Sequence, residues 1–140
     1  IEPGRALVAP YGALLANVVQ TKQEGERRWT MLDAGMNDLI RPALYGAKHR
    51  VELVDAPPSE PVWRVVGPVC ESSDDFGAHP LGPMPAGLVA LCDAGAYGFV
   101  LASEYNGRAL PAEVFVSGGK VVHVSASQGR SAWVKRRLEA

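Results

Sequence analysis

Cysteine is scarce in this sequence, in which only Cys70 and Cys92 occur. Two thiols cannot build the dense disulfide framework that small secreted domains use. No His/Cys spacing typical of zinc ligands accompanies them. We therefore expect reduced thiols, a cytoplasmic location and no metal site.

Charge of one sign and long apolar runs are also missing. The 14 basic and 15 acidic residues give a formal net charge of −1, which produces no field that would attract nucleic acid or an anionic membrane surface. No apolar stretch is long enough for a membrane span, and no signal peptide is evident. The 140 residues suffice for a single domain, 1–140. An initiator methionine is absent, so we expect that the chain was cut from something longer.

The sequence does contain a succession of short apolar runs separated by turn residues. Such a pattern predicts a mainly β domain, a small barrel or sandwich with short helices, because the long helical crossovers of a parallel sheet are missing. Residues 11–33 are expected to form a hairpin with a longer loop, 72–87 a long surface loop, 42–45 a helical turn and 130–140 a terminal helix. Strands are expected over 6–9, 12–20, 29–33, 51–54, 62–69, 88–93, 112–116 and 120–124.

Four clusters of polar residues and glycine stand at the ends of apolar runs, where functional sites tend to lie. They cover residues 2–5, 37–45, 67–74 and 93–98. The third cluster, Gly67-Pro68-Val69-Cys70-Glu71-Ser72-Ser73-Asp74, places a thiol beside a carboxylate. Each cluster also has an ordinary structural explanation: Cys is commonly buried, and an arginine or tyrosine at the position of Arg41 or Tyr45 often serves a surface ion pair or a core edge.

Taken together and in this order, the clusters resemble the C-terminal part of the diaminopimelate decarboxylases. The strings Val66-Gly67-Pro68-Val69-Cys70-Glu71-Ser72 and Asn37-Asp38-Leu39-Ile40-Arg41-Pro42-Ala43-Leu44-Tyr45 carry the resemblance. Ornithine and arginine decarboxylases of the same fold have a related Cys but not the Arg-Pro-Ala-Leu-Tyr string. The resemblance implies a C-terminal, Greek-key-like β-barrel of the alanine racemase fold type. The partner (β/α)₈ barrel is absent from this chain, and residues 1–5 would be its tail end.

The resemblance also implies a pyridoxal 5′-phosphate site. Glu2 would face the pyridine nitrogen of the cofactor, which makes the ring a deeper electron sink. Gly4 would allow the backbone to approach the phosphate, Tyr97 would bind phosphate and substrate, and Arg5 would reach a substrate carboxylate near the phosphate. The cofactor-bearing lysine belongs upstream, because none of the chain's lysines has a matching context. These are Lys22, Lys48, Lys120 and Lys135.

Substrate and catalytic roles follow from the same resemblance. Arg41 would bind the distal carboxylate of meso-diaminopimelate, with Tyr45 beside it. Cys70 would be the general acid that returns a proton to Cα, a task that suits a thiol because its ordinary pKa of about 8.5 keeps it mostly protonated at neutral pH. Glu71 would bind the distal ammonium. The thiol-bearing loop of one subunit would complete the site of its partner, which implies a homodimer.

The expected function is decarboxylation of meso-2,6-diaminopimelate to L-lysine and CO2, the last step of lysine biosynthesis. Two alternatives stay open: the same chemistry on another amino acid, of the ornithine or arginine type or carrier-bound, and a non-catalytic β-barrel interaction module. In the string Ser103-Glu104-Tyr105-Asn106-Gly107-Arg108, Gly107 departs from the family pattern, so no role is assigned there. The histidines, His49, His79 and His123, are isolated and receive no role either.

Overall fold

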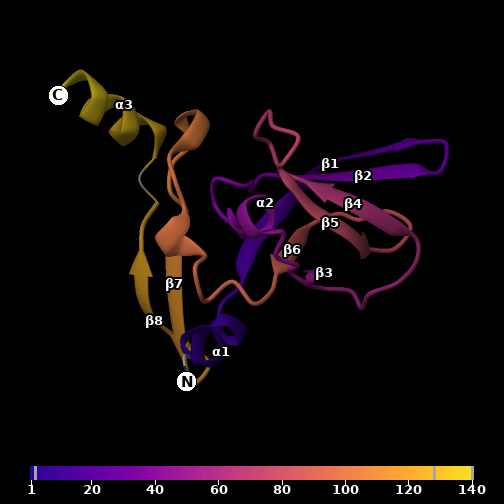
Figure 1. Cartoon of the computed structure of the whole chain (residues 1–140), viewed down its shortest axis with the longest axis horizontal. Coiled ribbons are helices and arrows are strands. Elements are labelled where there is room, and N and C mark those ends of the chain that lie inside the picture. The colour runs from indigo at the N-terminus through magenta and orange to yellow at the C-terminus, as the bar shows by residue number, and fades with distance from the viewer. Residues whose placement is uncertain (2, 128, 140) are drawn as a thin grey trace.

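The structure, a computed structural model, describes residues 1, 3–127 and 129–139. Short helices and strands alternate along these residues (Figure 1). The α-helices are α1 (Gly4–Val8), α2 (Arg41–Tyr45) and α3 (Arg130–Leu138), and single 3₁₀ turns cover Ala9–Tyr11, Phe99–Leu101 and Tyr105–Gly107. The strands are β1 (Leu14–Glu24), β2 (Arg27–Leu32), β3 (Val51–Leu53), β4 (Val62–Val66), β5 (Asp75–Pro80), β6 (Leu88–Leu91), β7 (Glu113–Ser117) and β8 (Lys120–Ser125).

Strands β1 to β6 form one sheet in the order β3-β6-β1-β2-β4-β5. Its two edge strands, β3 and β5, lie close to each other, so the sheet curls into a nearly closed barrel. Closure of this kind protects strand edges from pairing with other chains. The prediction of a mainly β, barrel-like domain with short helices is confirmed.

The predicted hairpin over 11–33 is also confirmed, with a shorter loop than expected. Its charged stretch continues both strands, and only Gly25 and Glu26 form the turn. Gly25 has φ of 59°, the left-handed conformation that tight hairpin turns require. Opposite charges then face each other across the ladder, as Glu24 opposes Arg27.

Two predictions about secondary structure are wrong. Residues 6–9 belong to α1 and the following 3₁₀ turn rather than to a strand, because an apolar run of four residues does not distinguish helix from strand. The predicted loop over 72–87 contains the edge strand β5, which pairs with β4. Its Gly77, His79 and Pro80 resemble a loop composition, yet an edge strand tolerates a proline that has no N–H to donate.

One strand pair is parallel, which the sequence did not predict. Strand β2 runs parallel to β4, with Thr30 opposite Val65. The connection between them, residues 33–61, is long enough because it contains α2 and β3. This crossover carries the 37–45 cluster and α2, and α2 contacts the edge strand β5.

The core lies inside the barrel. Strand β4 alternates as expected for a half-buried strand, since Trp63 and Val65 are buried while Arg64 is exposed. The largest fully buried apolar side chains are Leu32, Leu39, Leu91, Val65 and Val89. Burial of each such side chain contributes roughly 1.5–3 kcal/mol to folding.

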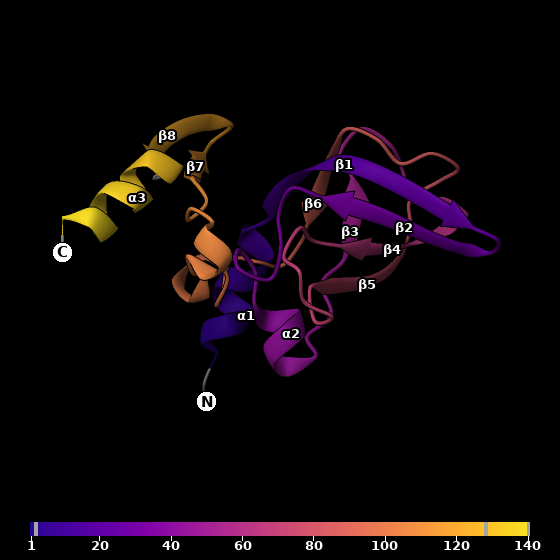
Figure 2. The ribbon, with the colours of Figure 1, turned by 90° about the horizontal axis from the view of Figure 1, so that it is seen from above.

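The hairpin β7–β8 and helix α3 stand apart from the barrel in both views (Figures 1 and 2). Their strands pair with each other and not with the six-stranded sheet. The turn between them has Gly118 and Gly119, both with positive φ, as predicted for a compact hairpin. The predicted terminal helix is confirmed as α3.

Candidate functional site

Helix α2 presents two predicted site residues on one face. Its first turn contains Pro42, whose fixed φ suits a helix start, and it ends at Gly46 with φ of 63°. Arg41 and Tyr45 are four residues apart and therefore point to the same side of the helix. Arg41 is only 8 % exposed, whereas Tyr45 is exposed.

Arg5 and Tyr97 join this pair around one cavity. The four side chains line a space of about 350 Å³, and they come from α1, from α2 and from the turn after β6. Two guanidinium groups and two phenol hydroxyls are all hydrogen-bond donors, and none of the described residues that line the cavity is a carboxylate. This donor set suits an anionic ligand.

A close backbone contact brings α1 against the turn that carries Tyr97. Gly95 donates a hydrogen bond of 3.1 Å to the carbonyl oxygen of Ala9, and a Cβ on Gly95 would lie 2.1 Å from the Val8 carbonyl oxygen. Only glycine fits there. Tyr97 itself has φ of 57°, which is uncommon outside glycine and is a form of strain that gathers at functional sites.

The charge of Arg41 has no carboxylate partner. Among the residues that the structure describes, no acidic side chain forms an ion pair with it, and its buried Nε has no hydrogen-bond partner. Its Nη1 lies 3.3 Å from Nε2 of His49. Buried charges are normally paired, so a guanidinium without such a partner at a cavity suits an anionic ligand.

The thiol loop, residues 67–74, connects β4 to β5 and exposes both Cys70 and Glu71. Asp74, which is 3 % exposed, holds it: its carboxylate accepts hydrogen bonds of 2.7 Å from the Val69 and Met36 amides. A Cβ at Gly67 would lie 2.4 Å from that carboxylate. Burial raises the pKa of Asp74, and the two amide hydrogen bonds oppose this shift without reversing it.

Glu71 has a partner that the sequence analysis left without a role. The Tyr105 hydroxyl donates a hydrogen bond of 2.5 Å to Oε1 of Glu71. This hydrogen bond to the carboxylate, together with its negative charge, raises the pKa of Tyr105. Tyr105 lies in a 3₁₀ turn far along the chain, so only the folded structure reveals the pair.

The structure places the predicted site residues in two groups. Cys70 and Glu71 line a hollow of about 500 Å³ with Arg64, Ser72 and their neighbours, and no described residue is common to this hollow and the cavity of Arg5, Arg41, Tyr45 and Tyr97. Gly4 lies in α1, where an added Cβ would meet nothing within 4 Å. Glu2 lies outside the described residues, so its predicted role has no geometry here.

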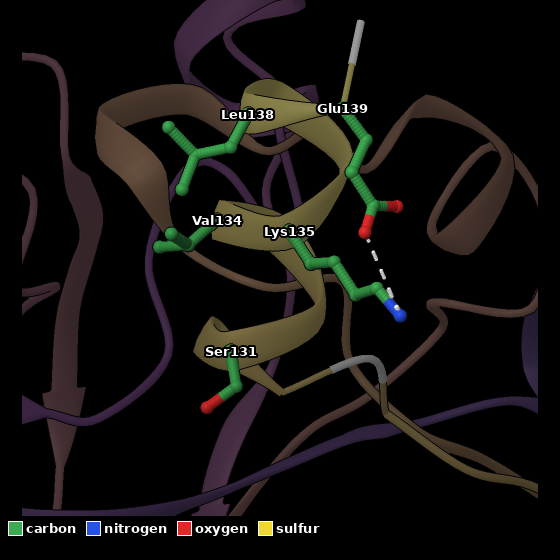
Figure 3. A pocket seen from close by; sticks show the side chains of 5 residues that line it. All are labelled: Ser131, Val134, Lys135, Leu138 and Glu139. Atoms are coloured by element: carbon green, nitrogen blue, oxygen red, sulfur yellow. Dashed lines mark ion pairs between the residues drawn. The ribbon is translucent and has the colours of Figure 1, made fainter.

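A further hollow lies on α3 and shows a different chemistry (Figure 3). Val134 and Leu138 project from one side of the helix, while Lys135 and Glu139 on the other side form an ion pair of 3.7 Å. The described lining offers apolar surface, the hydroxyl of Ser131 and a solvated ion pair, and such an ion pair contributes little to binding or stability. We assign no site there.

Comparison with known proteins decides the family. The model of the pyridoxal-dependent decarboxylase, C-terminal sheet domain, matches residues 8–95, more than half of the chain. The chain belongs to this family. The matched range includes Arg41, Tyr45, Cys70 and Glu71, and it ends just before Tyr97.

Individual members of the decarboxylase family agree in sequence. The diaminopimelate decarboxylase of Zymomonas mobilis is 46% identical over 123 residues, which cover 85% of this chain and 29% of that protein. The diaminopimelate decarboxylase of Bacteroides thetaiotaomicron is 49% identical over 112 residues, covering 79% and 29%. The chain therefore spans less than a third of the length of these curated relatives.

Solved structures of the family agree in fold. The diaminopimelate decarboxylase of M. jannaschii superposes with a TM-score of 0.86 and 34% identity, covering 94% of this chain and 31% of that one. The Helicobacter pylori enzyme complexed with L-lysine gives 0.84 and 36%, covering 96% and 34%. The predicted resemblance is confirmed. None of the helices in residues 1, 3–127 and 129–139 is long and apolar enough to cross a membrane.

Three residues of this decarboxylase domain were not recognised from the sequence as part of the site. His49 contacts Arg41, Asp74 holds the thiol loop, and Tyr105 binds Glu71. Asp74 was quoted within the Cys70 cluster, but nothing in the string showed that its side chain turns inward. His49 is isolated in the sequence, whereas Tyr105 lies in the string over 103–108 that resembles a family pattern; in both cases the partner is brought near only by tertiary structure.

Proposed function

We propose that this chain is the C-terminal domain of a pyridoxal 5′-phosphate-dependent decarboxylase that converts meso-2,6-diaminopimelate to L-lysine and CO2. The observation that carries the proposal is the buried guanidinium of Arg41, which forms no ion pair with a carboxylate in the described part of the chain and lies at the cavity shared with Arg5, Tyr45 and Tyr97. The reaction in the proposal is taken from the relatives named diaminopimelate decarboxylase.

Arg41 favours diaminopimelate over other amino acids. A planar guanidinium binds a planar carboxylate through two parallel hydrogen bonds. Diaminopimelate has a second carboxylate at the end that does not react, and ornithine does not. A substrate without that group would leave the buried charge of Arg41 unpaired, which costs binding energy. Tyr45, one helical turn away, adds a second donor to the same carboxylate.

The cofactor fits the donors of the same cavity. The Arg5 guanidinium and the Tyr97 phenol suit a phosphate and a nearby substrate carboxylate, and Gly4 leaves open space beside α1. Glu2 would pair with the pyridine nitrogen. When bound, pyridoxal phosphate supplies the electron sink for decarboxylation. The lysine that carries it belongs to the upstream barrel, and residues 1–5 would be the end of that barrel.

Cys70 and Glu71 act on the substrate directly in this proposal. Loss of CO2 breaks the bond between Cα of the D-centre and its carboxylate carbon and leaves an electron pair on Cα. The Cys70 thiol transfers its proton to Cα and recovers one from solvent, to which it is exposed. Glu71 binds the distal ammonium, and Tyr105 orients the Glu71 carboxylate through its hydrogen bond.

The two groups of residues meet across a homodimer in this proposal. Cys70 and Glu71 are exposed and lie in a hollow distinct from that of Arg41. Two copies of the chain can therefore complete each other, the thiol loop of one facing the cavity of its partner. The cytoplasmic location expected from the reduced thiols stays a prediction.

The test is CO2 release from meso-diaminopimelate by the full-length polypeptide loaded with pyridoxal phosphate. We expect Cys70→Ala to lower kcat by about 10²- to 10⁴-fold, as for loss of a general acid. Arg41→Ala should raise KM on the order of a hundredfold, as for loss of a buried charge contact. Arg50→Ala, which removes an exposed arginine paired with Glu52, is the matched control and should change neither constant.

Three results would contradict parts of the proposal. Release from ornithine but not from diaminopimelate would show a different substrate, and release from neither would favour a non-catalytic module. At a diaminopimelate concentration well below the KM of Arg41→Ala, mixing the impaired Cys70→Ala and Arg41→Ala polypeptides should raise activity above that of either variant alone, since hybrid dimers hold one intact site. Failure of the mixture to regain activity, with exchange of subunits demonstrated, would show that each chain uses its own thiol.

A further inference from the structure

His49 bridges the substrate-binding helix to the barrel. It lies between α2 and β3 and is 2 % exposed. Its Nε2 is 3.3 Å from Nη1 of Arg41, and its Nδ1 is 2.8 Å from the carbonyl oxygen of Cys92, just after β6. One buried imidazole thus links the Arg41 guanidinium to the end of β6, the strand that the Tyr97 turn follows.

The two partners determine the state of the imidazole. A guanidinium can only donate a hydrogen bond, so Nε2 must accept. A carbonyl oxygen can only accept, so Nδ1 must carry the proton. His49 is therefore neutral, with its hydrogen on Nδ1, and it neither offsets nor repels the charge of Arg41.

This arrangement leaves Arg41 available to a ligand. One edge of the guanidinium is fixed through Nη1, while the buried Nε stays without a partner among the described residues. A carboxylate in place of the imidazole would pair with the guanidinium and compete with any anion in the cavity. A neutral acceptor holds the group in place and leaves its charge for the ligand.

We propose that His49 is a positioning residue that fixes the Arg41 guanidinium for the distal carboxylate of the substrate, and thereby sets the preference for substrates that carry this carboxylate. The inference rests on the proposed function, because it takes Arg41 as the group that binds that carboxylate. The carboxylate in question is retained in the product.

L-Lysine and 1,5-diaminopentane form a matched pair of ligands, since they differ only by that carboxylate. Their affinities for the full-length enzyme loaded with pyridoxal phosphate can be measured by calorimetry, without turnover. We expect the wild type to prefer L-lysine and Arg41→Ala to lose the preference. If Arg41→Ala prefers L-lysine over 1,5-diaminopentane as strongly as the wild type does, the proposed function is contradicted, and His49 has no carboxylate-binding group to position.

Two substitutions of His49 separate positioning from packing. Glutamine places its amide oxygen about where Nε2 lies and can accept from Arg41, whereas asparagine replaces only the Nδ1 side and binds the Cys92 carbonyl. His49→Asn should weaken L-lysine binding on the order of tenfold, as for loss of one hydrogen bond to a charged group, and leave 1,5-diaminopentane binding unchanged. His49→Gln should stay within about threefold of wild type for both ligands.

The turnover of the same variants gives an independent result. His49→Asn should raise KM for meso-diaminopimelate on the order of tenfold with kcat little changed, and His49→Gln should restore KM. The inference is overturned if Arg41→Ala abolishes the preference for L-lysine while His49→Asn keeps it. Equal losses for both ligands, or equal losses in both His49 variants, would show a merely structural role and would also overturn it.

Discussion

Asp74→Asn tests whether the thiol loop depends on one buried carboxylate. In the native structure the two oxygens of Asp74 each accept a backbone N–H at 2.7 Å, from Met36 and from Val69. Asparagine has nearly the same shape but only one oxygen. Its NH2 group must then face one of the two amide donors, so one buried hydrogen bond is lost and one donor is left unsatisfied.

The magnitude follows from that loss. A buried donor left without a partner costs about 1–3 kcal/mol. Val69 directly precedes Cys70, so the cost falls on the loop that delivers the thiol and Glu71. Since about 1.4 kcal/mol corresponds to a factor of ten, we expect kcat/KM for diaminopimelate to fall by roughly 10- to 100-fold in the full-length enzyme, with a lower Tm.

The matched control is Asp55→Asn, because Asp55 is exposed in the loop after β3. This substitution should leave kcat/KM and Tm unchanged. If Asp74→Asn keeps wild-type activity and Tm, the carboxylate does not hold the thiol loop and the argument fails. Loss of Tm without loss of kcat/KM would show that Asp74 supports the barrel but not the position of Cys70.

Asp74 also predicts a pH dependence of stability. Burial raises its pKa above the ordinary 3.8, so the native state binds this proton more tightly than the unfolded chain does. The corresponding stability is present below pH 3.8 and is lost as the pH rises through the native pKa. The unfolding free energy of the wild type, measured relative to that of Asp74→Asn, should therefore fall as the pH rises above 3.8. A wild-type value that instead increases relative to the variant over this interval would contradict the raised pKa.

Two further substitutions probe the connections between the site and the rest of the domain. Tyr105→Phe removes the hydrogen bond to Glu71, so KM should rise more than kcat falls. The ultraviolet titration should also lose one tyrosine that ionises late because its pKa is raised. If the late ionisation persists in the variant, it belongs to another tyrosine. Gly95→Ala forces a Cβ to 2.1 Å from the Val8 carbonyl oxygen, so it should cost about 1–3 kcal/mol of stability and weaken pyridoxal phosphate binding. Gly129→Ala is the neutral control, because nothing lies within 4 Å of an added Cβ there. An equal loss of stability in both variants would refute the contact argument.

The sequence predicted the barrel because its strands carry their own pattern. In β4 the alternation of buried Trp63 with exposed Arg64 is visible in the residue types alone. Strand β5 has one buried apolar side chain, Phe76, among Gly, His and Pro, so its pairing with β4 decides its conformation. The apolar run over 6–9 shows neither a helical nor a strand period. In the structure these residues are helical, and the Ala9 carbonyl oxygen accepts a hydrogen bond from Gly95.

The candidate site was predictable to the extent that its residues stand in contiguous strings. Arg41 and Tyr45 share one helical turn, and Cys70 and Glu71 are adjacent, so two short strings that resemble the family contain all four residues. The partners that orient them lie far away: Tyr105 is 34 residues from Glu71, and the Cys92 carbonyl is 43 residues from His49. Such contacts are long-range, and a single sequence holds no local signal for them.

The segment between β2 and α2 is hydrogen-bonded to two distant parts of the candidate site. The Met36 amide binds Asp74 and so fixes the thiol loop, while the Asn37 carbonyl accepts a hydrogen bond of 2.8 Å from Ser103, two residues before Tyr105. Asp38 closes the turn by accepting from Gly35 at 2.9 Å, and α2 with Arg41 follows within one turn. One stretch of backbone therefore contacts the loop of Cys70, the turn of Tyr105 and the helix of Arg41, three residues with roles in the proposed function. A shift of this segment would move all three, so we expect substitutions of its polar residues to disturb the proposed site without any direct contact to the substrate.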